Sequence, residues 1–104
     1  MIRPALYEAI HPIEFVGPSG GQKITADVVG PVCETSDCFV RDAEIARPEE
    51  NDLVAILDAG AYGFAMSSNY NFRPRAAEVL VENGGATLIR RRENFDDLTR
   101  TEDV

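Results

Sequence analysis

The sequence predicts a mainly β domain, a small sandwich- or barrel-like fold with one short helix at its C-terminal end. Apolar residues occur in short, strand-like runs, and clusters of Gly, Pro, Asn and Asp separate these runs at frequent intervals. Frequent turn signals of this kind are typical of β-sandwiches and barrels. A chain of 104 residues is long enough for one domain, which we expect to span residues 1–104 and to bury a modest core.

The first half of the chain contains three expected strands. Residues 6–16 are apolar with interspersed polar positions, and they end at a turn rich in Gly and Pro, residues 17–21. Residues 23–29 alternate between apolar and polar side chains, which indicates a strand with one face on a core. Residues 38–45 are the third expected strand, and a charged turn follows at residues 47–52.

The second half contains an expected buried strand, a hairpin and a helix. Residues 53–57 form a continuous apolar run, which is typical of a strand buried on both faces. Residues 78–82 and 86–90 flank Asn-Gly-Gly at 83–85, and Asn and Gly tolerate the positive φ angles of a tight hairpin turn. Residues 94–99 are the one helix candidate, because an Asn can cap a helix whose first turn carries two Asp residues.

The charge and the hydrophobic pattern exclude several classes of partner. The formal net charge of −8 argues against nucleic acid, because an acidic surface repels phosphates. The three arginines at residues 90–92 are flanked by acidic residues, so we interpret them as a charge-paired strand end rather than a nucleic-acid patch. No apolar run approaches the ~20 residues of a membrane helix, and the N-terminus lacks the apolar stretch of a secretory signal. We therefore expect a cytoplasmic protein.

The cysteines and the histidine do not form a metal-binding pattern. Cys33 and Cys38 are too few for a disulfide framework, and their spacing is wrong for a zinc knuckle. His11 is the single histidine in the chain. We expect no metal site and no Ser-His-Asp triad, and we interpret His11 as a hydrogen-bonded structural residue.

Cys33 is the one plausible nucleophile or acid. Glu34 and Asp37 lie beside it in a loop, and their negative charges disfavour the thiolate. A thiol in that setting is a poor nucleophile and a better proton donor. The alternative is an ordinary structural role, because cysteine is among the most frequently buried residue types.

Tyrosine and arginine side chains at two other places are candidate ligand-binding groups. Tyr62 lies between Gly60 and Gly63, which would let the backbone turn sharply and present the phenol to an anionic ligand. Arg3 and Tyr7, in an extended or irregular entry segment, could frame a carboxylate. The alternatives are a tyrosine that caps a core, and a surface arginine beside a core tyrosine.

Five segments in register resemble the C-terminal domain of the diaminopimelate decarboxylase family, one of the alanine-racemase-like, fold type III pyridoxal-phosphate enzymes. The segments are Arg-Pro-Ala-Leu-Tyr at 3–7, Gly-Pro-Val-Cys-Glu-Thr-Ser-Asp at 30–37, Asp-Ala-Gly-Ala-Tyr-Gly at 58–63, Met-Ser-Ser-Asn-Tyr-Asn at 66–71, and Arg-Pro at 73–74 with Glu-Val-Leu at 78–80. Their order and spacing fit over nearly the whole chain.

The resemblance implies an enzyme of lysine biosynthesis that removes carbon dioxide from meso-diaminopimelate with pyridoxal 5′-phosphate. Family members have an N-terminal (β/α)8 barrel and form homodimers, in which the C-terminal β-domain of one subunit completes the site on the barrel of the other. The residues that the family uses correspond to a proton donor, Cys33; a group that reads the distal amine, Glu34; a contact to cofactor and substrate, Tyr62; and two substrate-binding residues, Arg3 and Tyr7. Ornithine-type decarboxylases usually carry Asp after the cysteine, so Glu34 favours the diaminopimelate branch.

Other parts of the family's site have no counterpart in this chain. The Schiff-base lysine, a histidine and the glycine-rich phosphate loop belong to the barrel, and the single lysine, Lys23, matches no cofactor motif. We therefore expect a fragment or separate domain that is inactive alone and that self-associates through exposed apolar surface. Asn-Asp at residues 51–52, where the family commonly has Gly-Asp, affects only a turn.

Two alternatives remain open at this point. The chain could be a non-catalytic β-domain that binds a partner, or it could be the equivalent domain of an ornithine- or arginine-type decarboxylase.

Overall fold

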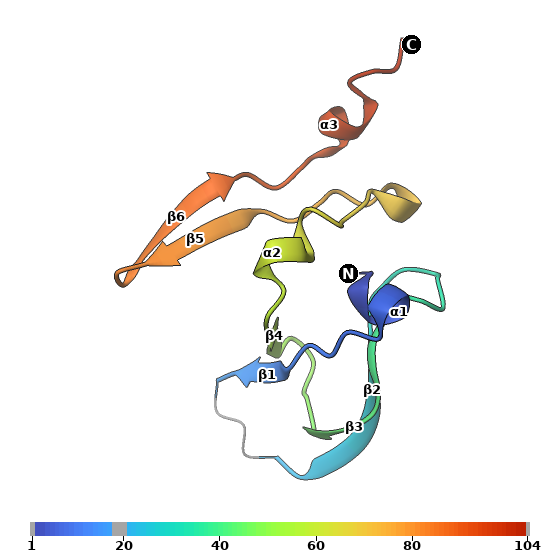
Figure 1. Ribbon diagram of the computed structural model, residues 1–104, viewed down its shortest axis with the longest axis vertical. Coiled ribbons are helices and arrows are strands. Elements are labelled where there is room, and N and C mark those ends of the chain that lie inside the picture. Colours follow the sequence, from blue (N-terminus) through green and yellow to red (C-terminus); the bar gives the residue numbers. More distant parts are fainter. Residues whose placement is uncertain (1, 18–20, 104) are drawn as a thin grey trace. The chain divides into compact units, whose positions relative to one another are not determined.

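The computed structural model describes residues 2–17 and 21–103, and the chain falls into two compact units, Met1–Met66 and Ser67–Val104 (Figure 1). The described residues form mostly strands with three short α-helices, so the prediction of a mainly β fold is confirmed. These strands pair as three two-stranded antiparallel sheets. Closure into a sandwich or barrel stays a prediction. The turn expected at residues 17–21 includes residues 18–20, which lie outside the described part.

A long ribbon in the first unit pairs β2 (Lys23–Val29) with β3 (Cys38–Ala46). Along β2, Ile24, Ala26 and Val28 are half-buried and the polar side chains between them are exposed, as the alternation predicts. The register shifts within the ribbon, and Asp42 takes a left-handed φ of 50°. The Asp42 amide donates to Asp27 Oδ1 at 2.9 Å. A bulge of this kind increases the twist of a ribbon.

The second sheet of this unit differs from the expectation. The strand expected over residues 6–16 is shorter, because β1 spans only Ile13–Val16 and a helical turn, α1 (Arg3–Tyr7), precedes it. Its partner β4 (Leu53–Ile56) was expected to be buried on both faces, which is wrong: Leu53 is 68% and Val54 44% exposed. Leu53 and Val54 are neighbours in the strand and therefore point to opposite faces, so both faces of β4 are open to solvent at this end.

The turn before β4 explains the Asn-Asp pair of the sequence. Asn51 has a φ of 76°, a left-handed conformation that Asn tolerates better than most residues. Around it, the Glu49 amide donates to Asp52 Oδ2 at 2.8 Å, and the Asp52 amide donates to the Glu49 carbonyl at 3.1 Å.

The second unit consists of a 3₁₀ turn, η1 (Tyr70–Phe72), a hairpin, β5 (Glu78–Glu82) with β6 (Gly85–Arg90), and a short helix, α3 (Phe95–Thr99). The hairpin is confirmed. Its two turn residues, Asn83 and Gly84, have φ angles of 49° and 77°, as a tight two-residue turn requires.

The C-terminal helix is confirmed with the expected cap. Asn94 Oδ1 accepts from the Asp97 amide at 3.0 Å, and Asp97 Oδ2 accepts from the Asn94 amide at 2.9 Å. This reciprocal capping box satisfies two donors at the helix start that would otherwise lack partners.

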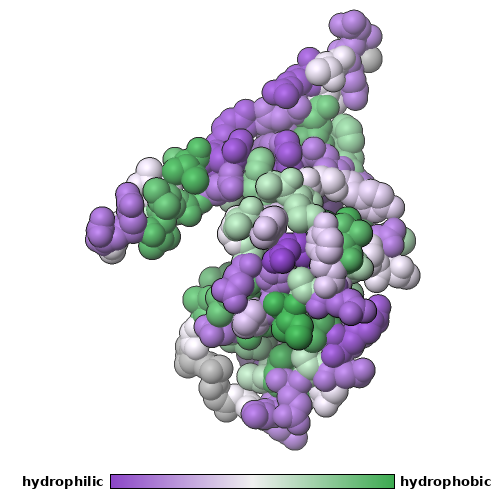
Figure 2. All heavy atoms as spheres, viewed as in Figure 1, coloured by the Kyte–Doolittle hydropathy of each residue, from purple (hydrophilic) through white to green (hydrophobic). Residues whose placement is uncertain are grey.

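The expectation of a buried core is wrong for the part of the chain that the structure describes. None of the hydrophobic side chains in that part is fully buried. Two-stranded ribbons bury little surface unless a second layer packs on them. Figure 2 shows apolar side chains gathered along the hairpin, where five large ones are exposed: Val79, Leu80, Val81, Leu88 and Ile89. Within the described ranges, no helix is long and apolar enough to cross a membrane.

Candidate functional site

The helical turn α1 carries Arg3 and Tyr7. Pro4 lies in its first turn, where proline is favoured because its missing N–H is not needed, and the helix ends at Glu8 with a left-handed φ of 53°. The expectation of an extended or irregular segment here is therefore wrong. Residues four apart share one face of a helix, so α1 places Arg3 and Tyr7 side by side.

Tyr62 lies in a second helical turn, α2 (Gly60–Gly63), and faces the arginine of the first. The guanidinium carbon of Arg3 lies 4.4 Å from the centroid of the Tyr62 ring, within the range of a cation–π interaction. The expectation that Gly60 and Gly63 form a sharp turn is wrong, since both belong to the helical turn. The change in chain direction before α2 instead includes Asp58, which has a left-handed φ of 53°.

Cys33 lies at the exposed tip of the loop between β2 and β3, with a free thiol. Asp37 organises this loop: its Oδ2 accepts from the Val32 amide at 2.9 Å, and its carbonyl accepts from the Gly30 amide at 2.8 Å. A Cβ on Gly30 would overlap the Asp37 carboxylate, so any larger residue at that position would have to displace this carboxylate. Sequence reasoning treated Asp37 only as a charge near the thiol and missed this role.

Glu34 follows Cys33 and bonds within the same loop. Its Oε1 accepts from the Ser36 amide at 3.2 Å and from the Thr35 hydroxyl at 3.3 Å. Glu34 is exposed, like Cys33. The expected effect of the two carboxylates on the thiol stays a prediction.

The structure therefore brings some of the predicted site residues together and leaves others on a separate loop. Arg3, Tyr7 and Tyr62 share one surface, which α1 and α2 build. Cys33 and Glu34 lie on the loop that leads into β3, and α1 contacts β3.

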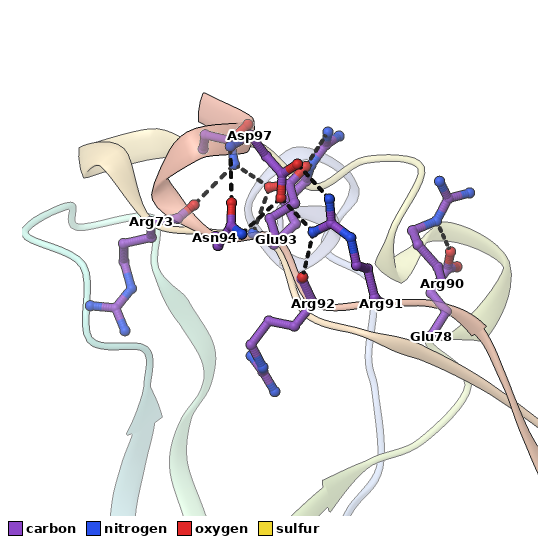
Figure 3. A network of polar contacts seen from close by, with 10 residues as sticks. Arg73, Glu78, Arg90, Arg91, Arg92, Glu93, Asn94 and Asp97 are labelled. Carbon is purple, nitrogen blue, oxygen red and sulfur yellow. Dashed lines mark hydrogen bonds and ion pairs between the residues drawn. The ribbon is translucent and has the colours of Figure 1, made fainter. Parts of the chain in front are cut away.

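In the second unit, Glu93 is the centre of a polar network (Figure 3). Its carboxylate accepts from the Arg75 side chain at 2.8 and 2.6 Å, from the Arg75 amide at 2.8 Å and from Asn69 Nδ2 at 2.7 Å. The hydrogen bond from the Arg75 side chain is the main cause that lowers the pKa of Glu93 to about 2. This network holds the end of the hairpin to residues 69–75, and the sequence analysis did not identify it.

Two of the three arginines at residues 90–92 are paired with acidic residues, as predicted (Figure 3). Arg90 pairs with Glu78 across the hairpin, and Arg91 makes a bidentate pair with Asp97, with Nη2 to Oδ1 at 2.6 Å. The Arg91 hydrogen bonds hold the pKa of the Asp97 carboxyl well below its usual range. The interpretation as a charge-paired strand end is confirmed for Arg90 and Arg91.

Comparison with known proteins identifies the class. Residues 1–60 match the family described as the C-terminal sheet domain of pyridoxal-dependent decarboxylases, and the chain belongs to that family. Among the curated relatives, the diaminopimelate decarboxylase of Aquifex aeolicus is 56% identical over 96 residues, which is 92% of this chain and 23% of the relative.

Solved structures agree with that assignment. An Aquifex aeolicus crystal structure superposes with a TM-score of 0.92 at 53% identity, over 99% of this chain and 26% of the other. Diaminopimelate decarboxylase from Helicobacter pylori, complexed with L-lysine, superposes with a TM-score of 0.89 at 46% identity, over 96% of this chain and 25% of the other. The chain thus spans about a quarter of the length of the relatives it matches, and the predicted resemblance is confirmed.

The described residues offer limited contacts to the cofactor that the family name implies. Tyr62 is 48% exposed, and its phenol can donate to a bound ligand. The single lysine, Lys23, is exposed at the start of β2, on the polar face of that strand. Within the described ranges, no group of three or more His, Cys, Asp or Glu residues could hold a metal ion.

Proposed function

We propose that this chain is the C-terminal part of a diaminopimelate decarboxylase, which converts meso-2,6-diaminopimelate to L-lysine and carbon dioxide. One observation carries the proposal: Arg3 and Tyr62, from two motifs far apart in the sequence, lie in contact on an accessible surface, with Tyr7 on the same helix face as Arg3. A guanidinium beside two phenols can bind and orient a carboxylate. The lysine complex of the Helicobacter pylori relative supports this substrate class, because lysine is the product of the proposed reaction.

Cys33 and Glu34 supply the remaining chemistry of this chain. Pyridoxal phosphate, when bound, provides the electron sink that makes loss of carbon dioxide possible. The Cys33 thiol then donates its proton to the α-carbon of the substrate, and its exposed position at a loop tip suits that transfer. Glu34, the adjacent exposed carboxylate, accepts from the distal ammonium group of the substrate.

The partners that complete the site are a barrel domain of the same enzyme and a second subunit in a homodimer. The exposed apolar side chains of the β5–β6 hairpin support the proposal of such partners. A two-stranded ribbon is marginally stable in water by itself, so we expect another surface to cover it. In this proposal residues 1–104 form the C-terminal β-domain, and the chain is inactive and self-associates when alone. The setting is the cytoplasm, because Cys33 must remain a thiol to donate a proton.

The test is reconstitution of the complete site. The chain is joined to, or mixed with, the remaining part of the Aquifex aeolicus relative, and lysine formation is measured with pyridoxal phosphate and meso-diaminopimelate. Cys33→Ala should reduce lysine formation by at least a hundredfold, within the ~10²–10⁴-fold typical of general acid catalysis. Cys38→Ala is the matched control, because Cys38 bonds to the Val40 carbonyl within β3 and should not affect the rate.

The outcomes separate the alternatives. Lysine that depends on the chain and on Cys33 supports the proposal. Binding to the barrel part with no dependence on Cys33 would indicate a non-catalytic module. Faster turnover of ornithine or arginine than of meso-diaminopimelate would indicate a decarboxylase of the polyamine pathway.

A further inference from the structure

His11 is the one buried polar side chain of the described residues, with 5% of its surface exposed. Its Nδ1 lies 2.9 Å from the Leu57 carbonyl oxygen. Because a carbonyl can only accept, Nδ1 must carry a proton and donate it to the Leu57 carbonyl. Nε2 is buried and has no hydrogen-bond partner among the described residues.

The two residues that this bond joins lie in the segments that connect the strands β1 and β4 to the two helical turns of the proposed binding surface. His11 lies between α1, which carries Arg3, and the start of β1. Leu57 follows β4 directly and precedes the left-handed residue Asp58, from which the chain enters α2. A second bond reinforces the junction, since the Leu57 amide donates to the Pro12 carbonyl at 2.8 Å.

We propose that His11 is a positioning residue for the substrate-binding surface, acting through the Nδ1–Leu57 hydrogen bond. This bond ties the segment that follows α1 to the segment that precedes α2, and thereby keeps the Arg3 guanidinium over the Tyr62 ring. A left-handed Asp58 stores strain that the surrounding contacts must hold. The inference rests on the proposed function in one respect, namely that Arg3 and Tyr62 bind a substrate.

The buried Nε2 raises a competing role, in which this nitrogen itself takes part in the chemistry. Asparagine and glutamine distinguish the two roles. The Asn side-chain amide can place its N–H where Nδ1 is and keep the bond to the Leu57 carbonyl, whereas the Gln amide places its polar atoms near the position of Nε2. A positioning role through Nδ1 therefore predicts that His11→Asn is tolerated and that His11→Gln is not.

The first test needs no activity. Because His11 is the single histidine of the chain, long-range ¹H–¹⁵N spectra of the labelled chain give one unambiguous imidazole. We expect Nδ1 to be of the protonated type and Nε2 of the bare type. A dominant Nε2–H tautomer, or an imidazole averaging between the two tautomers, would overturn the proposal whatever the reaction of the enzyme.

The second test uses the reconstituted enzyme. For His11→Gln we expect the KM for meso-diaminopimelate to rise about tenfold with kcat nearly unchanged, the effect of losing one hydrogen bond that orders a binding surface. For His11→Asn we expect both constants to stay within about twofold of the starting enzyme. Rescue by Gln and not by Asn, or a loss confined to kcat, would contradict the proposal. A complete lack of lysine formation by the unmutated enzyme would count against the proposed function, and the spectra would still decide the role of His11.

Discussion

Gly30→Ala should loosen the loop that presents Cys33. The alanine Cβ would overlap the Asp37 carboxylate, so that carboxylate must move away. Moving it breaks the bond in which the Val32 amide donates to Asp37 Oδ2 at 2.9 Å. The backbone bond from Gly30 to the Asp37 carbonyl does not need to break. The expected result is a local opening of the loop with β2 and β3 intact.

The magnitude follows from the bond that is lost. A hydrogen bond to a charged group contributes about 1.5–3 kcal/mol, and Asp37 is half-buried, so we expect a cost of about 1–2 kcal/mol. This corresponds to an increase of about 5–30-fold in the population of the open loop. Asp37→Ala should cost a similar amount on its own, because it removes the same acceptor. In the Asp37→Ala background, Gly30→Ala should add almost nothing.

Hydrogen exchange of the Val32 amide measures the opening directly, and alkylation of Cys33 provides a second probe. Cys38, within β3, serves as the internal control for alkylation. The double-mutant cycle should give a coupling of about 1–2 kcal/mol between positions 30 and 37. Equal effects of Gly30→Ala with and without the Asp37 carboxylate would refute the reasoning, since the overlap would then not be the cause.

Three further predictions concern the second unit. The pKa of Glu93 is lowered to about 2, so the contribution of its ionised carboxylate to stability should be complete above the ordinary carboxyl pKa of ~4.3 and be lost as the pH falls from there toward 2. Urea titrations at several pH values in this range should show the loss, and Glu93→Gln should abolish this pH dependence. A urea midpoint of the unmutated chain that does not change with pH would contradict the prediction. Asn94→Ala should destabilise α3 by about 1 kcal/mol, whereas Asn94→Ser should retain most of the stability that the cap provides. Hydrogen exchange of the Asp97 amide measures the effect, and unchanged protection of this amide in Asn94→Ala would count against the cap. Val81→Lys should weaken the self-association of the chain, measured by sedimentation, because it places a charge among the exposed apolar side chains of the hairpin. Glu82→Lys, at the neighbouring position, is the control and should not weaken it. A single monomer mass for the unmutated chain would show that the apolar surface does not drive association.

Local features of the fold could be predicted because short-range chemistry determines them. The Asn-Gly turn adopts the positive φ angles that suit these two residues, and the β5–β6 hairpin follows from that turn. Asn94 and Asp97 form their capping box within one helical turn. The alternation along β2 reports correctly which side chains are half-buried, because each side chain of a strand points opposite to its neighbours.

The helical turns α1 and α2 could not be read from periodicity. They span five and four residues, too few for a 3.6-residue repeat to emerge. Pro4, together with the spacing of Arg3 and Tyr7, was the available signal for α1. The glycines that bound α2 pointed away from a helix, since glycine is a poor helix former.

The sequence by itself determined the strands of the hairpins, the C-terminal cap, the charge-paired strand end and the family, all of which depend on neighbouring residues or on residue identity at a fixed spacing. The tertiary structure alone decided that Arg3 meets Tyr62, that Asp37 occupies the space above Gly30, and that His11 is buried against Leu57. These contacts join segments that only chain folding brings together. The apolar run of β4 shows the same limit: its composition indicates that its faces can be covered, but only the arrangement of other strands decides whether they are.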